Sequence, residues 1–462
     1  MARLTFPMAN ALAQTDRQAP FGLKRRSFQG PAALAILGLL ALGLGALFVS
    51  SLTTLIALCL ATLLAIAGYL WLQARCADYE QPLFLPRLFL VAYGLRLLAA
   101  FAIFFLDTKG VFTYDQTLYW DIGQQWAAHW RGDSPLPPTV YLPSTYYYSL
   151  WVGALDRLTL DTALAPCVVN AFLGAMLVYL LYQIADKHLG APHVGRCAAL
   201  MVAFIPGMVI WSALNMRDTI AVFFTTLALR EIIELRGRVS FTAFARLAVW
   251  CVGIGAVRAY VIPMLAVAFC AGLLAAGFRG RTSRLLIPVV LVGLIAAFLV
   301  SGGIQELVSQ MISLQYENLE GARQGLAYGN AAYLTDIHLK STADIARFLP
   351  IMLVYFLGGP FLWLFSGLQA AMLVPELIAW YTLMVLAARG LWIARRRFPA
   401  ALPIMTFLLV ASVLYSLVSG NFGTAIRHRA QLVPSMILLA SLGWPRRRIV
   451  RFAPGIEHDR ST

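Results

Sequence analysis

The stretch TLIALCLATLLAIAGYLWLQ, residues 54–73, decides the fold, because it runs for 20 residues without a charged side chain. A helix of about 20 residues rises about 30 Å, which is the thickness of the hydrocarbon layer of a membrane. Of the 462 residues in the chain, 60% are hydrophobic and only 12% are charged. A soluble domain carries about 25% charged residues, so ordinary soluble cores cannot hide these apolar residues. The composition therefore predicts an all-α polytopic membrane protein.

Similar apolar stretches recur along the chain and predict about twelve membrane-spanning helices. They lie at about residues 31–49, 54–73, 87–106, 164–184, 197–215, 219–235, 244–257, 260–278, 285–302, 373–394, 399–418 and 430–444. Two long and more polar segments, 107–163 and 303–346, interrupt this rhythm. The sequence shows no internal repeat and no low-complexity segment.

One further apolar stretch, 348–366, does not fit this count. It contains Gly358, Gly359 and Pro360, which interrupt helices. We expect a re-entrant or interfacial element here, which is tolerated at membrane depth only where protein or water satisfies its backbone. The alternative is that another short span, 244–257, is misassigned.

The distribution of positive charge predicts the orientation. The net charge is +15, but Lys and Arg lie in short clusters between apolar stretches, which does not suit a nucleic-acid-binding face. With a cytoplasmic N-terminus, inner segments hold 25 of the 36 Lys and Arg residues and outer segments hold 10. Cytoplasmic loops carry such an excess, so both long segments are predicted outside. Residues 1–30 and 446–462 are then cytoplasmic tails around a transmembrane domain at 31–445.

The first outer segment contains a candidate catalytic acid. Leu118, Ile122, Trp126 and Trp130 recur at helical spacing, which predicts a helix lying on the outer membrane surface. Asp115 stands just before this helix. One interpretation is an N-cap, in which the carboxylate accepts a hydrogen bond from a backbone N–H. The other is a general base held beside a cavity.

Two tyrosines in the same segment are candidate sugar contacts. Prolines up to Pro143 predict an irregular crossing, and Tyr146, Tyr147 and Tyr148 follow directly. The aromatic rings suit the membrane–water interface. Tyr146 and Tyr147 are also able to stack on a sugar ring, and the sequence leaves both interpretations open.

A second acid, Asp218, is predicted at the same face. It follows Arg217 in a turn between two spans. Asp218 can cap the helix that follows, or it can converge with Asp115 on one outer cavity and form an acid–base pair.

Arginines at the outer edge run against the expected charge bias. Arg258 lies between two spans, and Arg427 and Arg429 flank His428 in a short outer loop. Their guanidinium groups, with that of Arg217, are candidate ligands of a phosphate. The alternative is that they reach toward anionic lipid headgroups.

Two charged side chains, those of Arg96 and Glu376, fall inside predicted membrane spans. Arg96 and Glu376 cost several kcal/mol in a membrane unless they are paired or face water. We expect a structural role for Arg96, and we expect Glu376 to line the re-entrant region.

The sequence lacks a Walker A loop, G-x-S-x-G, H-E-x-x-H, C-x-x-C among its six cysteines, and any cluster with metal-ligand spacing. It therefore indicates no cofactor and no metal.

These motifs resemble those of the GT-C superfamily of integral-membrane glycosyltransferases, in particular the branch of protein mannosyltransferases and bacterial polyprenyl-phosphate-sugar transferases. The resemblance covers about residues 85–235 and rests on the order of short motifs. They are Tyr114-Asp115-Gln116 leading into Tyr119-Trp120-Asp121-Ile122, Pro143-Ser144-Thr145-Tyr146-Tyr147, Arg217-Asp218-Thr219, and Arg427-His428-Arg429 with Pro434. The family has Glu where Gln116 stands, which leaves open whether Asp115 or Asp121 is the working base.

The resemblance implies an inverting glycosyltransferase of the bacterial inner membrane. Such enzymes move a sugar from a polyprenyl-phosphate carrier to a cell-envelope glycan or lipid at the outer face. An aspartate deprotonates the acceptor, and basic residues hold the lipid phosphate. Two alternatives remain: an O-antigen or polysaccharide polymerase or ligase, which depends on arginines of later loops, and a transporter or flippase, for which inverted repeats are expected.

Overall fold

The computed structural model describes residues 51–106, 114–137, 143–189, 192–237, 240–276, 331–361, 368–394 and 398–445, with parts of 321–327. Its helices are α2 (Leu52–Arg75), α3 (Phe84–Leu106), α4 (Tyr114–Arg131), α5 (Pro143–Leu158), α6 (Ala165–Ile184), η1 (Ala185–Leu189), α7 (Pro192–Phe204), α8 (Pro206–Ser212), α9 (Arg217–Gly237), α10 (Phe241–Arg258), α11 (Val261–Ala276), α15 (Thr342–Gly358), α16 (Leu368–Ala394), α17 (Phe398–Val418) and α18 (Phe422–Gly443). These ranges contain no strand, only an isolated antiparallel bridge between Ala332 and Asn421. The expected spans at 31–49 and 285–302 and both tails lie outside the described residues.

The described helices include several that suit a membrane. Six are long and apolar enough to cross it: Leu52–Arg75, Phe84–Leu106, Ala165–Leu189, Phe241–Arg258, Val374–Ala394 and Ala400–Val418. Together α7 and α8 make a seventh candidate, bent by 58°. Large apolar side chains cover the outside of these helices, with Leu63, Leu98 and Val385 each at least 65% exposed, as expected where lipid replaces water. The chain is thus an all-α membrane protein, whereas the count of twelve spans stays a prediction.

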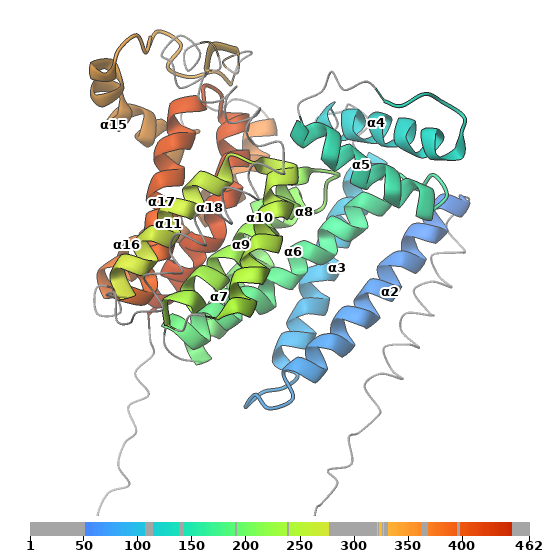
Figure 1. Ribbon diagram of the computed structural model, residues 1–462, viewed down its shortest axis with the longest axis horizontal. Coiled ribbons are helices and arrows are strands. Elements are labelled where there is room, and N and C mark those ends of the chain that lie inside the picture. The colour runs from blue at the N-terminus through green and yellow to red at the C-terminus, as the bar shows by residue number, and fades with distance from the viewer. Residues whose placement is uncertain are drawn as a thin grey trace, which may run out of the picture.

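The helix expected on the membrane surface is present as α4. Figure 1 shows α4 and α5 lying across one end of the tilted bundle, beyond the ends of α2 and α3. The two helices pack closely, because a Cβ atom on Gly153 would lie only 2.6 Å from the carbonyl oxygen of Gly123. The rings of Tyr119 and Tyr148 meet edge to face, 4.8 Å apart between centroids. This packing fixes the start of α4 over the bundle.

Both charged residues inside predicted spans stabilise the break between α7 and α8. Pro206 cannot donate a hydrogen bond, so the helix leaves backbone groups unpaired at this break. The guanidinium of Arg96 donates to the carbonyl oxygens of Val202 (2.8 Å) and Ala203 (3.2 Å) at the end of α7. The carboxylate of Glu376 accepts from the backbone N–H of Gly207 (2.5 Å) at the start of α8. Arg96 thus has the structural role that the sequence favours.

The first part of the predicted re-entrant stretch is the end of α15, which packs against α17. Residues 362–367 lie outside the described part, so the re-entrant course itself stays a prediction. Just before α15, the segment around Tyr333 joins the turn that begins α18. The backbone N–H of Tyr333 donates to the carbonyl of Gly420, and that of Phe422 donates to the carbonyl of Ala331, each at 2.9 Å. The end of the second long segment therefore lies beside the start of α18.

Candidate functional site

Asp115, Asp218 and Arg427 meet where α4 crosses the bundle. Asp115 lies in the first turn of α4, Asp218 in the first turn of α9, and Arg427 near the start of α18. One nitrogen of the Arg427 guanidinium donates to Asp115, and the other donates to Asp218 at 3.2 Å. The structure thus joins two acids through an arginine that lies 312 and 209 residues from them in the sequence.

Asp218 is the buried centre of this cluster. Its side chain is 1% exposed, and its second carboxylate oxygen accepts from Arg258, which also donates to the hydroxyl of Tyr260. Burial alone would raise the pKa of Asp218, but the charges of Arg258 and Arg427 outweigh burial and hold this pKa below its usual range. The positive end of α9 also favours a negative charge here. Asp218 is therefore an ionised group with both oxygens occupied.

The cluster is rich in arginine and is open on one side. Arg217 acts on Asp218 as a third positive charge beside Arg258 and Arg427. Three arginines thus lie around two carboxylates. The side chains of Asp115 and Arg427 are 32% and 24% exposed, so the open side is the side of these two residues. A group that approaches from there meets a carboxylate and a guanidinium together.

A buried polar network holds the turn before Asp218 against α4 and α5. The carbonyl oxygen of the Gln116 side chain accepts from the backbone N–H of Asn215 at 2.8 Å. The Asn215 side chain accepts from the hydroxyl of Tyr148 at 2.9 Å, and Asn170 donates to the carbonyl oxygens of Leu214 (2.8 Å) and Met216 (3.0 Å). Gln116 thus holds this turn against the start of α4.

The sequence alone does not indicate that Tyr260, Asn215, Tyr148 and Asn170 belong to this site. Tyr260 follows Arg258 by two positions and Asn215 precedes Arg217 by two, so nearness to the chosen arginines was the one available indication. Tyr148 and Asn170 stand in apolar helices, where the pattern is typical of packing.

Asp121 and the two candidate sugar-binding tyrosines lie away from the cluster. Asp121 is exposed and stands six residues after Asp115, which places it about 120° around the helix. Tyr146 packs edge to face on Trp126, in the second half of α4, with 5.1 Å between ring centroids. Tyr147 beside it is 40% exposed.

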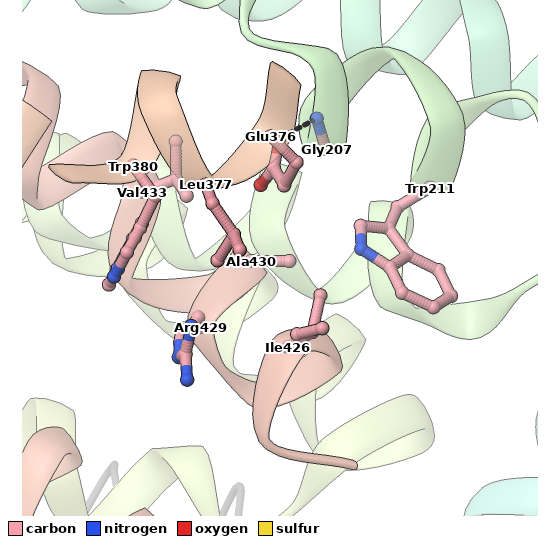
Figure 2. Close-up of a pocket in the computed structure, with 9 residues that line it drawn as sticks. All are labelled: Gly207, Trp211, Glu376, Leu377, Trp380, Ile426, Arg429, Ala430 and Val433. Carbon is pink, nitrogen blue, oxygen red and sulfur yellow. Dashed lines mark hydrogen bonds between the residues drawn. The ribbon is translucent and has the colours of Figure 1, made fainter. Parts of the chain in front are cut away.

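Arg429 faces a different part of the molecule from Arg427. It is buried and donates to the carbonyl oxygens of Phe356 (2.5 Å) and Gly359 at the end of α15. Figure 2 shows it among the residues that line a small cavity between α8, α16 and α18, which Gly207 and Glu376 also line. This cavity holds about 10 Å³, which is room for one water at most and not for a phosphate. The structure therefore brings Arg427, but not Arg429, to the two acids.

A metal site is not apparent in the described ranges, where no three His, Cys, Asp or Glu side chains gather so that they could hold an ion. The two acids of the cluster are bridged by an arginine instead.

Comparisons with known proteins give a weak similarity to solved structures. No protein-family model and no curated protein matches the sequence. Among solved structures, the chain is similar to the archaeal oligosaccharyltransferase AglB from Archaeoglobus fulgidus, in complex with an inhibitory peptide and a dolichol-phosphate. The identity is 13% and the TM-score 0.43, with 76% of this chain covered. The matched part of the chain covers only 50% of the length of that protein.

Proposed function

We propose that this protein transfers a sugar from a polyprenyl-phosphate-linked donor to a cell-envelope glycan or lipid acceptor, at the outer face of the bacterial inner membrane. The observation that carries the proposal is the contact of Arg427 with both Asp115 and Asp218. It combines a partly exposed carboxylate, which a base requires, with the guanidinium group of an arginine, which suits a phosphate.

In this proposal Asp115 is the general base. The acceptor hydroxyl gives its proton to the Asp115 carboxylate while its oxygen forms a bond to the anomeric carbon of the sugar. On the opposite face the bond from that carbon to the phosphate oxygen breaks, and the electron pair leaves with the lipid phosphate. The anomeric configuration is therefore inverted. Asp115 is the better placed of the two acids, because both oxygens of Asp218 already accept from arginines.

The arginines bind the donor phosphate in this proposal. Negative charge grows on the phosphate as the bond to the sugar breaks, and fixed guanidinium groups stabilise that charge. Arg427 is the central ligand, with Arg217 and Arg258 supplying further positive charge. Asp218 is a positioning residue, which holds Arg258 and Arg427 in place. Tyr146 and Tyr147 stay candidate contacts of the acceptor or sugar.

The proposed enzyme has about twelve spans with cytoplasmic tails at 1–30 and 446–462, and with 348–366 re-entrant. This topology puts Asp115, Asp218, Arg258 and Arg427 on the outer side. The proposed topology is supported by the position of these four residues, which lie together at the end of the bundle that α4 crosses. Arg75, Lys187 and Arg246, which the same topology puts on the inner side, instead line a separate cavity beside α2, η1 and α10.

The test is the lipid that accumulates when the chain is deleted from its host. Mass spectrometry of membrane lipids should find a polyprenyl monophosphate carrying a single sugar, raised several-fold over the parent strain and restored by a plasmid copy. An accumulated polyprenyl diphosphate oligosaccharide would instead favour a polymerase or ligase. Unchanged lipid-linked sugars would contradict the proposal.

A further inference from the structure

A second polar cavity, of about 320 Å³, lies far from the acid–arginine cluster. It is lined from the ends of α2 and α6, from η1, and from α9 and α10. On α9, the lining residue Glu234 stands 16 residues after Asp218, which corresponds to about 24 Å along a helix. The cavity is thus a separate site at the opposite end of the bundle, and it does not depend on the proposed function.

The cavity carries an excess of positive charge. Its four basic side chains are those of Arg75, Lys187, Arg230 and Arg246. Glu231 is fully buried beside it and accepts from both Arg230 (2.5 Å) and Arg246 (2.8 Å), and Glu234 accepts from Arg246 at 3.3 Å. The cavity thus has two more basic side chains than the two carboxylates that pair with Arg230 and Arg246.

This excess belongs to Arg75 and Lys187. Neither forms an ion pair with any residue of the described ranges, whereas Arg230 and Arg246 already share their carboxylates. The guanidinium of Arg75 lies over the ring of Trp71, 5.5 Å from its centroid, and Trp71 packs edge to face on Tyr179 at 5.1 Å. A rigid aromatic wall therefore keeps one unpaired cation at the rim of the cavity.

The backbone at the cavity is also unusual. Lys187 and His188 belong to η1, a π-helical turn that continues α6. Such turns occur mostly as single insertions in α-helices and often mark functional sites. The buried Nε2 atom of His188 has no hydrogen-bond partner among the described residues, so a polar atom at the cavity wall is left unsatisfied.

We propose that this cavity binds the phosphate of a small phosphate ester. A phosphate carries one or two negative charges and accepts from arginine and lysine, which matches the two unpaired cations. The volume exceeds that of a phosphate alone and leaves room for the alcohol that it esterifies. Two sources share this chemistry: the headgroup of an anionic membrane lipid, reached past the 42% exposed Trp71, and a soluble phosphate ester.

The experiment measures binding to the purified full-length protein in detergent by calorimetric titration. The probes are short-chain phosphatidylglycerol, glycerol phosphate and, as a zwitterionic control, short-chain phosphatidylcholine. Arg75→Gln and Lys187→Gln each remove an exposed, unpaired cation and leave the pairs of Glu231 intact. The matched control is Arg87→Gln, which removes an exposed charge outside the cavity near the start of α3.

We expect Arg75→Gln and Lys187→Gln each to weaken phosphatidylglycerol binding about fivefold, and Arg87→Gln to leave it unchanged. If glycerol phosphate binds equally well and competes, the source is soluble; if only phosphatidylglycerol binds, the source is the lipid. Either outcome supports a phosphate site. The proposal is overturned if neither anionic probe binds better than phosphatidylcholine, or if all three variants weaken binding equally.

Discussion

Arg427 holds Asp115 and Asp218 with the two arms of one guanidinium, and this contact separates their roles. Asp218 is 1% exposed and accepts from a second arginine, so an outside hydroxyl has no free oxygen to reach. Asp115 is 32% exposed and lies at the open side. The geometry therefore favours Asp115 over Asp218 as the group that accepts a proton from an outside hydroxyl.

Arg427→Lys is expected to impair donor use. Lysine keeps the positive charge but cannot bridge two carboxylates with a planar fork. In a transfer assay with the purified protein, the apparent donor KM should rise about tenfold or more, with normal yield of folded protein. An unchanged donor KM in both Arg427→Lys and Arg427→Ala would contradict phosphate binding by this residue.

Arg429→Lys is the matched variant for that experiment. Arg429 donates to the carbonyl oxygens of Phe356 and Gly359, so we expect its loss to lower the yield and thermal stability of the protein and to leave the donor KM unchanged. A rise in donor KM equal to that of Arg427→Lys would restore the phosphate role predicted from the sequence.

Asp156 should make stability depend on pH. Its carboxylate on α5 is 1% exposed and forms no ion pair with a basic side chain of the described residues. Burial, and then the nearby Asp161, raises the pKa of Asp156 to about 6. The folded state therefore binds a proton more tightly than the unfolded state, and stability falls as pH rises from about 4 to about 6. Asp156→Asn should raise the thermal midpoint at pH 8 by several degrees and change it little at pH 4; equal shifts at both would contradict this.

At the scale of elements, a broken helix is stabilised from both sides by charged residues of other helices. Arg96 of α3 binds carbonyl groups at the end of α7, and Glu376 of α16 binds the N–H of Gly207 in α8. The sequence shows that both charges are costly inside a span. It could not show their partners, because these are backbone groups more than 100 residues away.

Arg96→Met should destabilise the protein, because it leaves buried carbonyl groups without donors. Each unsatisfied group costs about 1–3 kcal/mol, so the thermal midpoint in detergent should fall by several degrees. Glu376→Gln keeps an acceptor oxygen for Gly207 and should be milder than Glu376→Leu. Equal midpoints for Arg96→Met and the parent would show that these bonds do not stabilise the break.

The sequence predicts helices well here and predicts their contacts poorly. Apolar stretches and aromatic spacing locate α2, α3, α4, α6 and α17 to within a few residues. The order of short motifs selects Asp115 and Asp218. The spacing of residues in the sequence cannot indicate that Arg427 contacts both acids, because that contact depends on how α4, α9 and α18 cross in space. For the same reason the sequence does not distinguish Arg427 from Arg429, although these two residues bind different neighbours.

At the scale of the whole molecule, the proposed orientation is testable by labelling. Gln125 on α4, Gly325 and, between α2 and α3, Gln81 are exposed. In a variant without the six native cysteines, Gln125→Cys and Gly325→Cys should react from outside intact cells with an impermeant thiol reagent. Gln81→Cys should react only after the membrane is opened. The reverse pattern would place the acid–arginine cluster inside and contradict an outer-face reaction.

The central claim is that Asp115 is the general base, and Asp115→Asn tests it most directly. Asparagine has nearly the same size and shape as aspartate, and Asp115 is partly exposed, so the variant should express and fold normally. An amide cannot take the proton, so we expect transfer to fall at least about a hundredfold and the lipid-linked sugar to accumulate as in the deletion strain. Asp121→Asn, on another face of α4, should restore the deletion strain fully. Near-normal transfer by folded Asp115→Asn would contradict the account, and loss of activity in Asp121→Asn alone would make Asp121 the base.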